Sequence, residues 1–189
     1  MKIGIMGAHG CGKTTLAREL ADFYKDDCLL LSEGARECPF PINQGMSLKS
    51  QRWLLARQIS MEHYAGCDRH IICDRTVMDP IVYATWMMEV TNNKEFVKFL
   101  ASAVPFALDW FRTEYDLVVW CRPDGREISD DGFRDLDPDF QRRIDDIFGR
   151  MLNGWELDWV CPAAIRTSLI ECEKEKLADE VQQCHAATA

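Results

Sequence analysis

The sequence predicts an α/β fold in which five parallel strands, ordered 2-3-1-4-5, are covered by helices on both faces. Short apolar runs alternate with longer amphipathic segments along the chain, a pattern typical of parallel strands joined by helices. A glycine-rich loop follows the first apolar run at once. The 189 residues contain no repeat and no linker-like stretch, so one domain spanning residues 1–189 is expected.

The first half of the chain alternates as this fold requires. Strands are predicted over residues 2–6, 28–33 and 70–74, where apolar runs are short. Helices are predicted over TTLARELADFY, residues 14–24, and over residues 47–66. Helical spacing in the longer helix gives an apolar stripe of Leu48, Leu55 and Ile59.

The second half continues the pattern. Asp79-Pro80 is expected to begin a helix, because aspartate and proline favour the first turn. Another helix is expected over residues 94–111, kinked or split at Pro105. Strands are predicted over residues 116–121 and 165–172, followed by a polar helix.

A stretch rich in glycine, proline and acidic residues follows the fourth predicted strand. Such composition is typical of exposed, mobile segments, so residues 122–137 are expected to form a lid. Asp137-Pro138 then begins a helix that extends to about Trp155.

The composition disfavours several kinds of partner. The formal net charge of −9 argues against broad binding to nucleic acid or membranes, because a basic surface supplies that affinity. No apolar run reaches the roughly 18 residues of a membrane span, and MKIGIMG does not resemble a secretory signal. Nine cysteines include no C-x-x-C pair, so reduced thiols in a cytoplasmic protein are expected.

The loop GAHGCGKTT, residues 7–15, matches G-x-x-x-x-G-K-[ST] between a predicted strand and a predicted helix. Glycines let backbone N–H groups point at phosphate oxygens, and a helix N-terminus favours an anion. Lys13 is expected to reach the β- and γ-phosphates, and the Thr14 hydroxyl to bind Mg²⁺. ATP with Mg²⁺ is therefore predicted, held by Gly7, Ala8, His9, Gly10, Cys11, Gly12, Lys13, Thr14 and Thr15.

The third predicted strand ends in an acidic residue, within HIICDRT. Ligands bind at the carboxyl ends of parallel strands, so Asp74 is expected to hold Mg²⁺ directly or through water. Hydrolases of this class usually have a glutamate next, which activates water, whereas Arg75 stands here. A guanidinium steadies anionic oxygens but is not a base. The pattern favours transfer over hydrolysis, with an ordinary strand-end ion pair as the alternative.

The second predicted strand also ends in an acid, within LLLSEGARE. In a sheet ordered 2-3-1-4-5, Glu33 lies across from the triphosphate and is expected to accept a proton from a substrate hydroxyl. A surface or helix-capping glutamate is the alternative. Arg36 either contacts substrate or phosphate or is solvated, and Asp79 either binds a substrate hydroxyl or caps its helix.

The lid carries Arg122, Arg126 and Arg134. Lid arginines of phosphotransferases balance charge on the reacting phosphate in the transition state. DDGFR is the most lid-like piece of the segment, so Arg134 is the predicted catalytic arginine.

Several ring-bearing and amide side chains are candidates for contact with a flat substrate ring. Trp53, Tyr83 and Trp86 stack on such a ring or pack in the core. The helix over residues 47–66 also offers Gln51 and Gln58, whose amides can bond a ring edge.

The motifs GAHGCGKTT, LLLSEGARE, IICDRTVMDPIVYA and DDGFR together resemble the P-loop small-molecule kinases. They are similar to the nicotinamide riboside kinase and deoxynucleoside kinase branches, next to the nucleoside monophosphate kinases. The resemblance extends from residue 1 to the helix after Asp137. It implies a P-loop NTPase fold of the monophosphate-kinase type, with the ATP γ-phosphate passed to a nucleoside, nucleotide or related small acceptor.

The resemblance also implies roles for single residues. Glu33 matches the family's acid at the end of the second strand, and Asp74-Arg75-Thr76 resembles its [DE]-R-[ST] element. In that element the acid serves metal or acceptor, and the arginine steadies phosphate. Gly-Ala-Arg follows Glu33, whereas proline is common there in deoxynucleoside kinases, so their substrate is not implied. EGARE is closer to a riboside-kinase-like group of the AAA type.

Two other functions stay open at this point. A regulatory protein that uses NTP hydrolysis as a switch is disfavoured, because the aspartate of a guanine-specific N-K-x-D motif does not follow Asn93-Lys94. A motor of the AAA type is also disfavoured, because it needs a further helical domain. A kinase acting on a hydroxyl within a polynucleotide is disfavoured by the acidic charge. Assembly into a homo-oligomer is compatible with the sequence.

Overall fold

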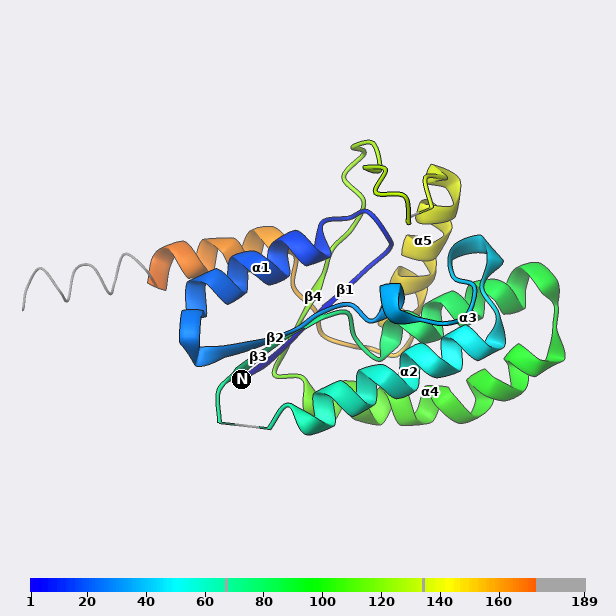
Figure 1. Cartoon of the computed structure of the whole chain (residues 1–189), viewed down its shortest axis with the longest axis horizontal. Coiled ribbons are helices and arrows are strands. Elements are labelled where there is room, and N and C mark those ends of the chain that lie inside the picture. The colour runs from blue at the N-terminus through cyan, green and yellow to red at the C-terminus, as the bar shows by residue number, and fades with distance from the viewer. Residues whose placement is uncertain (67, 134, 173–189) are drawn as a thin grey trace, which may run out of the picture.

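In the computed structural model, residues 1–66, 68–133 and 135–172 are described. The centre is a parallel sheet ordered β2-β3-β1-β4, seen nearly edge-on in Figure 1. Its strands are β1 (Lys2–Met6), β2 (Cys28–Leu31), β3 (His70–Asp74) and β4 (Leu117–Trp120). The α/β class and the order of these four strands are as predicted.

The predicted fifth strand is wrong for the described residues. Residues 162–172 are helical, because Ile165 and Leu169 are four residues apart and pack together against the core beside β1. The fifth place in the sheet is taken only by Val160, which forms an isolated parallel bridge with Val119. Its N–H donates to Val118 O at 2.9 Å. The sheet therefore narrows to a single bridged residue at this edge.

Helices cover both faces of the sheet (Figure 1). Helix α1 and the helical residues 162–172 cover one face, where Ile3, Ile5 and Leu16 form a small core. A larger core on the other face includes Met6, Cys73 and residues of the four remaining helices. The helices are α1 (Lys13–Tyr24), α2 (Leu48–Tyr64), α3 (Met78–Thr91), α4 (Lys94–Glu114) and α5 (Pro138–Gly154).

Local chemistry explains most helix boundaries. Ser47 precedes α2 and forms a capping box with Ser50. Asp137 caps α5 by accepting from Asp139 N, with proline in the first turn as predicted. A kink or a split is expected at Pro105, and the structure excludes the split, because α4 is one helix through that residue. Short 3₁₀ turns lie at Lys25–Asp27, Ala35–Glu37 and Asn43–Gly45. None of the described helices has both the length and the apolarity that crossing a membrane requires.

Candidate phosphoryl-transfer site

The glycine-rich loop links β1 to α1 and depends on residues without side chains. Gly7 has φ +140°, and a Cβ there would lie 2.1 Å from Cys121 O, so no other residue fits. Gly12 adopts a left-handed conformation with φ 81° and caps α1. The ammonium of Lys13 is buried and donates to Ala8 O at 2.5 Å. Residues of the loop and Lys13 line a common space, and backbone N–H groups and a cation in such a loop suit an anion.

The predicted metal ligands lie side by side. Thr14 Oγ1 donates to Asp74 Oδ2 at 2.6 Å, across 60 positions in the sequence. The other oxygen, Asp74 Oδ1, is buried and has no hydrogen-bond partner among the described residues. A hydroxyl and a carboxylate with a spare oxygen suit Mg²⁺, which prefers oxygen ligands. The residues present therefore fit the metal that the sequence predicts.

Arg75 follows β3 and is held between two carboxylates. Its Nε donates to Glu33 Oε1 at 2.6 Å, and its Nη1 donates to Asp79 Oδ1 at 3.0 Å. Burial lowers the pKa of Arg75, but the charges of Glu33 and Asp79 outweigh burial and raise it. The guanidinium is therefore a permanent cation with a fixed direction.

Asp79 stabilises the turn after β3, a role that differs from both the substrate contact and the helix cap predicted as alternatives. Helix α3 begins at Met78, and Asp79 is not its cap. Instead, Asp79 Oδ2 accepts from Thr76 N at 2.9 Å and from Thr76 Oγ1 at 3.1 Å. Burial raises the pKa of Asp79, while Arg75 opposes that change. Asp79 thus shapes the turn after β3 and orients Arg75.

Two adjoining pockets share one pair of residues. The smaller pocket lies against the loop and is lined by Gly10, Gly12, Lys13, Thr14 and Thr15, together with Glu33 and Arg75. The other, called the larger pocket because more residues line it, lies among α2, α3 and the lid. Glu33 and Arg75 line it as well, with Gln51, Gln58, Asp79, Tyr83 and Phe133. The Glu33–Arg75 pair therefore stands at the junction of the loop pocket and the larger pocket.

The segment predicted to form a lid, described at residues 122–133 and 135–137, lies between β4 and α5 and contacts both sides of the site. On the loop side, Ile128 Cγ2 lies 3.0 Å from the place where a Gly10 Cβ would be. On the other side, Arg36 pairs with Asp131 and lies 4.6 Å above the Phe133 ring. Asn43 Nδ2 also donates to Phe133 O at 2.7 Å. Arg36 is thus engaged with the lid.

The lid arginines that the structure describes face carboxylates. Arg122 Nη2 donates to Asp145 Oδ2 at 3.0 Å, and Arg126 Nη2 pairs with Asp124 Oδ2 at 2.6 Å. The predicted catalytic arginine, Arg134, lies outside the described residues.

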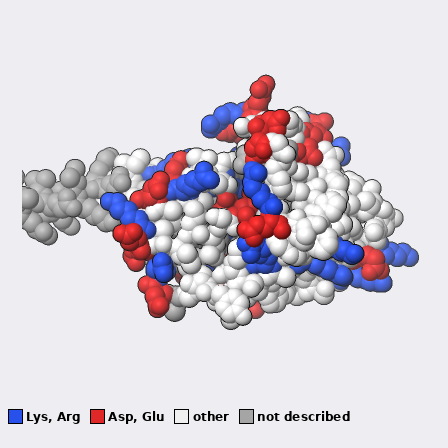
Figure 2. Space-filling view, viewed as in Figure 1, with Lys and Arg blue, Asp and Glu red and all other residues white. Residues whose placement is uncertain are grey.

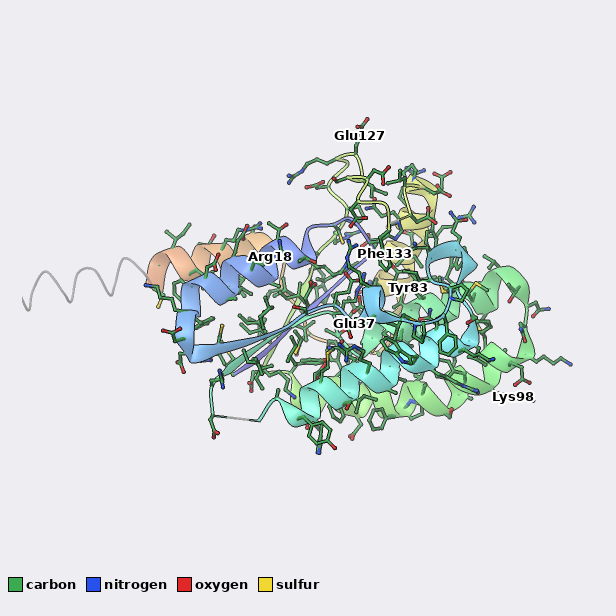
Figure 3. All side chains as sticks on the ribbon, viewed as in Figure 1. Arg18, Glu37, Tyr83, Lys98, Glu127 and Phe133 are labelled. Atoms are coloured by element: carbon green, nitrogen blue, oxygen red, sulfur yellow. The ribbon has the colours of Figure 1, made fainter. Side chains whose placement is uncertain are left out.

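Of the three aromatic candidates, Tyr83 alone lines the larger pocket. Its hydroxyl lies 3.3 Å from His9 Nδ1. Burial, with the charges of Lys13 and Arg75, lowers the pKa of His9 to about 4, so the imidazole is neutral at physiological pH. Trp86 packs on Phe140 with ring centroids 4.6 Å apart. Figure 3 shows Tyr83 below Phe133, where α3 approaches the lid.

The two glutamines of α2 have different surroundings. Gln51 is 2% exposed, and its Oε1 has no hydrogen-bond partner among the residues described. Gln58 Nε2 donates to Arg75 O at 2.9 Å and to Glu62 Oε1 at 2.8 Å. Gln51 Oε1 is therefore available to a ligand, whereas the amide nitrogens of both glutamines are occupied by the protein.

Sequence reasoning missed two residues around the site. One is Phe133, which lies within the motif DDGFR, where an aromatic residue in an acidic segment is the signal that could have found it. The other is Glu62 of α2, which is only 2% exposed. No pattern in the sequence distinguishes it from the exposed acids.

Comparison with known proteins places this geometry in a family. A family model described as an AAA domain matches residues 2–167. The chain belongs to this AAA domain family. No curated protein matches the sequence.

Solved structures show the same fold in kinases. This AAA domain matches deoxyadenosine kinase from M. mycoides, with dCMP and dCDP bound, at a TM-score of 0.63 and 18% identity, covering 95% of this chain and 100% of that one. The same enzyme with dCTP bound matches at a TM-score of 0.65 and 17% identity, with the same coverage of both chains. NadR protein in complex with NR matches at a TM-score of 0.66 and 22% identity, covering 85% of this chain and 45% of NadR. The resemblance to P-loop nucleoside kinases is thus confirmed for the fold.

Proposed function

We propose that this AAA domain transfers the γ-phosphate of ATP to a hydroxyl of a nucleoside or a related small molecule. The observation that carries the proposal is the Glu33–Arg75 pair, because both residues line the loop pocket and the larger cavity. A base and a cation at such a junction lie where a phosphoryl group passes from donor to acceptor.

The loop pocket is the proposed donor side. Backbone N–H groups of the loop and the Lys13 ammonium bind the triphosphate tail. Thr14 and Asp74 would hold Mg²⁺, which neutralises charge on the β- and γ-oxygens when bound. Two features support this assignment: the 2.6 Å contact of Thr14 with Asp74 and the unpartnered Asp74 Oδ1.

Glu33 and Arg75 have complementary roles in the proposed transfer. The acceptor oxygen forms a bond to the γ-phosphorus, and the bond from that phosphorus to the β–γ bridging oxygen breaks, leaving ADP. The hydroxyl proton passes to the Glu33 carboxylate. The Arg75 guanidinium stabilises the equatorial oxygens of the transferred group. Its 2.6 Å bond with Glu33 keeps the base and the cation within reach of one atom.

Charge pairing around the larger pocket favours a nucleoside over a nucleotide as acceptor. Arg75 faces two carboxylates, Arg57 Nη2 pairs with Glu37 at 2.5 Å, and Arg36 pairs with Asp131. A dianionic phosphate on the acceptor needs cations that are not already neutralised. A hydroxyl compound without phosphate fits this pocket better.

The ligands of the structural neighbours are consistent with this class. The deoxyadenosine kinase structure holds dCMP as a product, and the NadR structure holds NR. We therefore propose a flat ring on the acceptor, bordered by Tyr83 and Phe133, with Gln51 Oε1 free to accept a hydrogen bond from its edge.

Enclosure of the pocket argues against a polynucleotide acceptor. The lid and the segment after β2 meet over it through Arg36, Asn43 and Phe133, and these contacts would have to open to admit a polymer. Acidic side chains gather at the top of the view in Figure 2, over the lid region. Polyanions are repelled by such a surface.

An acceptor screen tests the proposal. ADP release is followed with Mg-ATP and, in turn, nucleosides, their 5′-monophosphates, nicotinamide riboside and a single-stranded oligonucleotide. We expect slow release with ATP alone and a large increase with at least one nucleoside. Stimulation by monophosphates only would reassign the acceptor, and fast acceptor-independent hydrolysis would point to a regulatory ATPase.

A further inference from the structure

A buried carboxylate lies behind the proposed site, on the side of α2 that faces the sheet. Glu62 is 2% exposed, and burial raises its pKa. Its oxygens accept hydrogen bonds from Gln58, from the Tyr115 hydroxyl at 2.6 Å and from Trp110 Nε1 at 2.9 Å. Lys2 Nζ lies 3.8 Å away. Burying an acid is costly even with such partners, so its place in the core calls for a reason.

Two of these partners connect Glu62 to the turn after β3. Gln58 Nε2 donates to Glu62 Oε1 at 2.8 Å and to Arg75 O at 2.9 Å. The Tyr115 hydroxyl donates to the same oxygen and accepts from Val77 N at 3.2 Å. Glu62 Oε1 thus accepts hydrogen bonds from two side chains, Gln58 and Tyr115, which we call the two arms. Each arm also bonds the backbone on one side of the turn, at Arg75 O and at Val77 N, and these bonds are called the grip.

The gripped turn has an unusual backbone. Arg75 has φ 110°, a positive value that residues with a Cβ rarely adopt. Thr76 at the centre is fully buried. Gly4 of β1 makes room for the assembly, because a Cβ there would lie 2.8 Å from Thr76 Cγ2 and 3.0 Å from the Tyr115 ring. Such a conformation persists only where its surroundings determine it.

We propose that Glu62 is a positioning residue that acts through Gln58 and Tyr115. It holds the turn from Arg75 to Val77 so that the Arg75 guanidinium lies between Glu33 and Asp79. That this orientation of Arg75 speeds phosphoryl transfer rests on the proposed function. The hydrogen bonds that hold the turn do not depend on that function.

The test compares loss of either arm with loss of a bond to the other oxygen of Glu62. Tyr115→Phe and Gln58→Met each remove one arm. Trp110→Phe is the matched control, because the single indole N–H of Trp110 donates to Glu62 Oε2 and not to Gln58 or Tyr115. The readout is solvent exchange of the Arg75 Nε–H, followed by NMR on the full chain without nucleotide. None of the three variants alters an atom bonded to that group.

We expect exchange of the Arg75 Nε–H to quicken about fivefold or more in each arm variant, and to stay within about twofold in Trp110→Phe. Equal exchange in arm variants and control would overturn the proposal. If one arm variant does not fold, the other carries the comparison.

A second measurement separates this inference from the proposed function. With a nucleoside that the wild type phosphorylates, the arm variants should lower kcat about tenfold while the KM for ATP changes less than about threefold. Unchanged kcat alongside faster exchange would show that the posture of Arg75 does not matter for transfer, which would overturn the positioning role. A wild type that phosphorylates no nucleoside would refute the proposed function, while the exchange result would still decide on the grip.

Discussion

Glu33 and Arg75 approach from the ends of two neighbouring strands, and Arg75 Nε donates to Glu33 Oε1 at 2.6 Å across 42 positions of sequence. Strands β2 and β3 are parallel and adjacent, so the residues that follow them meet at the same edge of the sheet. Because this pair borders both pockets, its chemistry can be separated from donor binding and from acceptor binding by substitution.

Removal of the loop cation should abolish transfer. Lys13→Ala is expected to lower kcat about 100-fold or more, because electrostatic positioning supplies most of phosphoryl-transfer catalysis. The measurement is ADP release with the best acceptor. Lys98→Ala is the control, since Lys98 is exposed at the far end of the helical layer (Figure 3). Retention of more than about a tenth of wild-type turnover in Lys13→Ala would contradict the role.

Neutralising Glu33 should affect chemistry far more than ATP binding. Glu33→Gln keeps the shape but loses the base, so kcat should fall about 100-fold while ATP affinity changes less than about threefold. Turnover kinetics and ATP titration measure the two quantities. Glu171→Gln, an exposed acid that lines neither pocket, controls for loss of charge. Parallel losses of turnover and affinity would make Glu33 a structural residue.

Phe133 should govern the acceptor rather than the donor. It lines the larger pocket and is absent from the loop pocket. Phe133→Ala removes a ring that borders the acceptor, so the acceptor KM should rise about tenfold while the ATP KM stays within about twofold. Phe106→Ala, on the exposed side of α4, is the matched control. A rise in both KM values would place Phe133 in lid closure as a whole.

Acid should destabilise the fold through His9. Its pKa is lowered from 6.5 to about 4, so between these values the unfolded chain binds more protons than the folded one. Stability therefore falls as pH drops through this window, by about 2–3 kcal/mol in total from this residue. Buried acids with raised pKa, such as Glu62 and Asp79, act in the opposite direction.

The difference between wild type and His9→Gln isolates this contribution. Urea unfolding from pH 7 to pH 4 should show a flatter pH dependence in His9→Gln than in wild type. His63→Gln, at an exposed position, should follow the wild-type curve. If the free energy of unfolding changed with pH equally in all three proteins, protonation of His9 would not be linked to stability.

Local patterns were enough to predict some of the site and some of the sheet. The loop, β1 and α1 are contiguous in sequence, so their motif predicts the phosphate pocket directly. Apolar runs ending in an acid marked β3 and Asp74. The same reasoning is wrong at residues 165–172, where the apolar run predicts a strand although Ile165 and Leu169 have helical spacing and lie in a helix.

Helix α2 shows why burial was harder to predict. Its expected apolar stripe was Leu48, Leu55 and Ile59, yet only Leu55 is buried. The deeply buried face carries Gln51, Gln58 and Glu62 instead, because it borders the cavity and the turn after β3. Periodicity of hydrophobic residues cannot detect a face buried for polar contacts.

The sequence by itself determined the α/β class, the phosphate loop and the acids at the strand ends, because each depends on residues close together in the chain. Tertiary structure alone decided that Arg36 pairs with the lid, that Phe133 enters the larger pocket and that Glu62 grips the turn at Arg75. Those contacts join segments that are far apart in sequence, and their partners are set by how helices pack on the sheet.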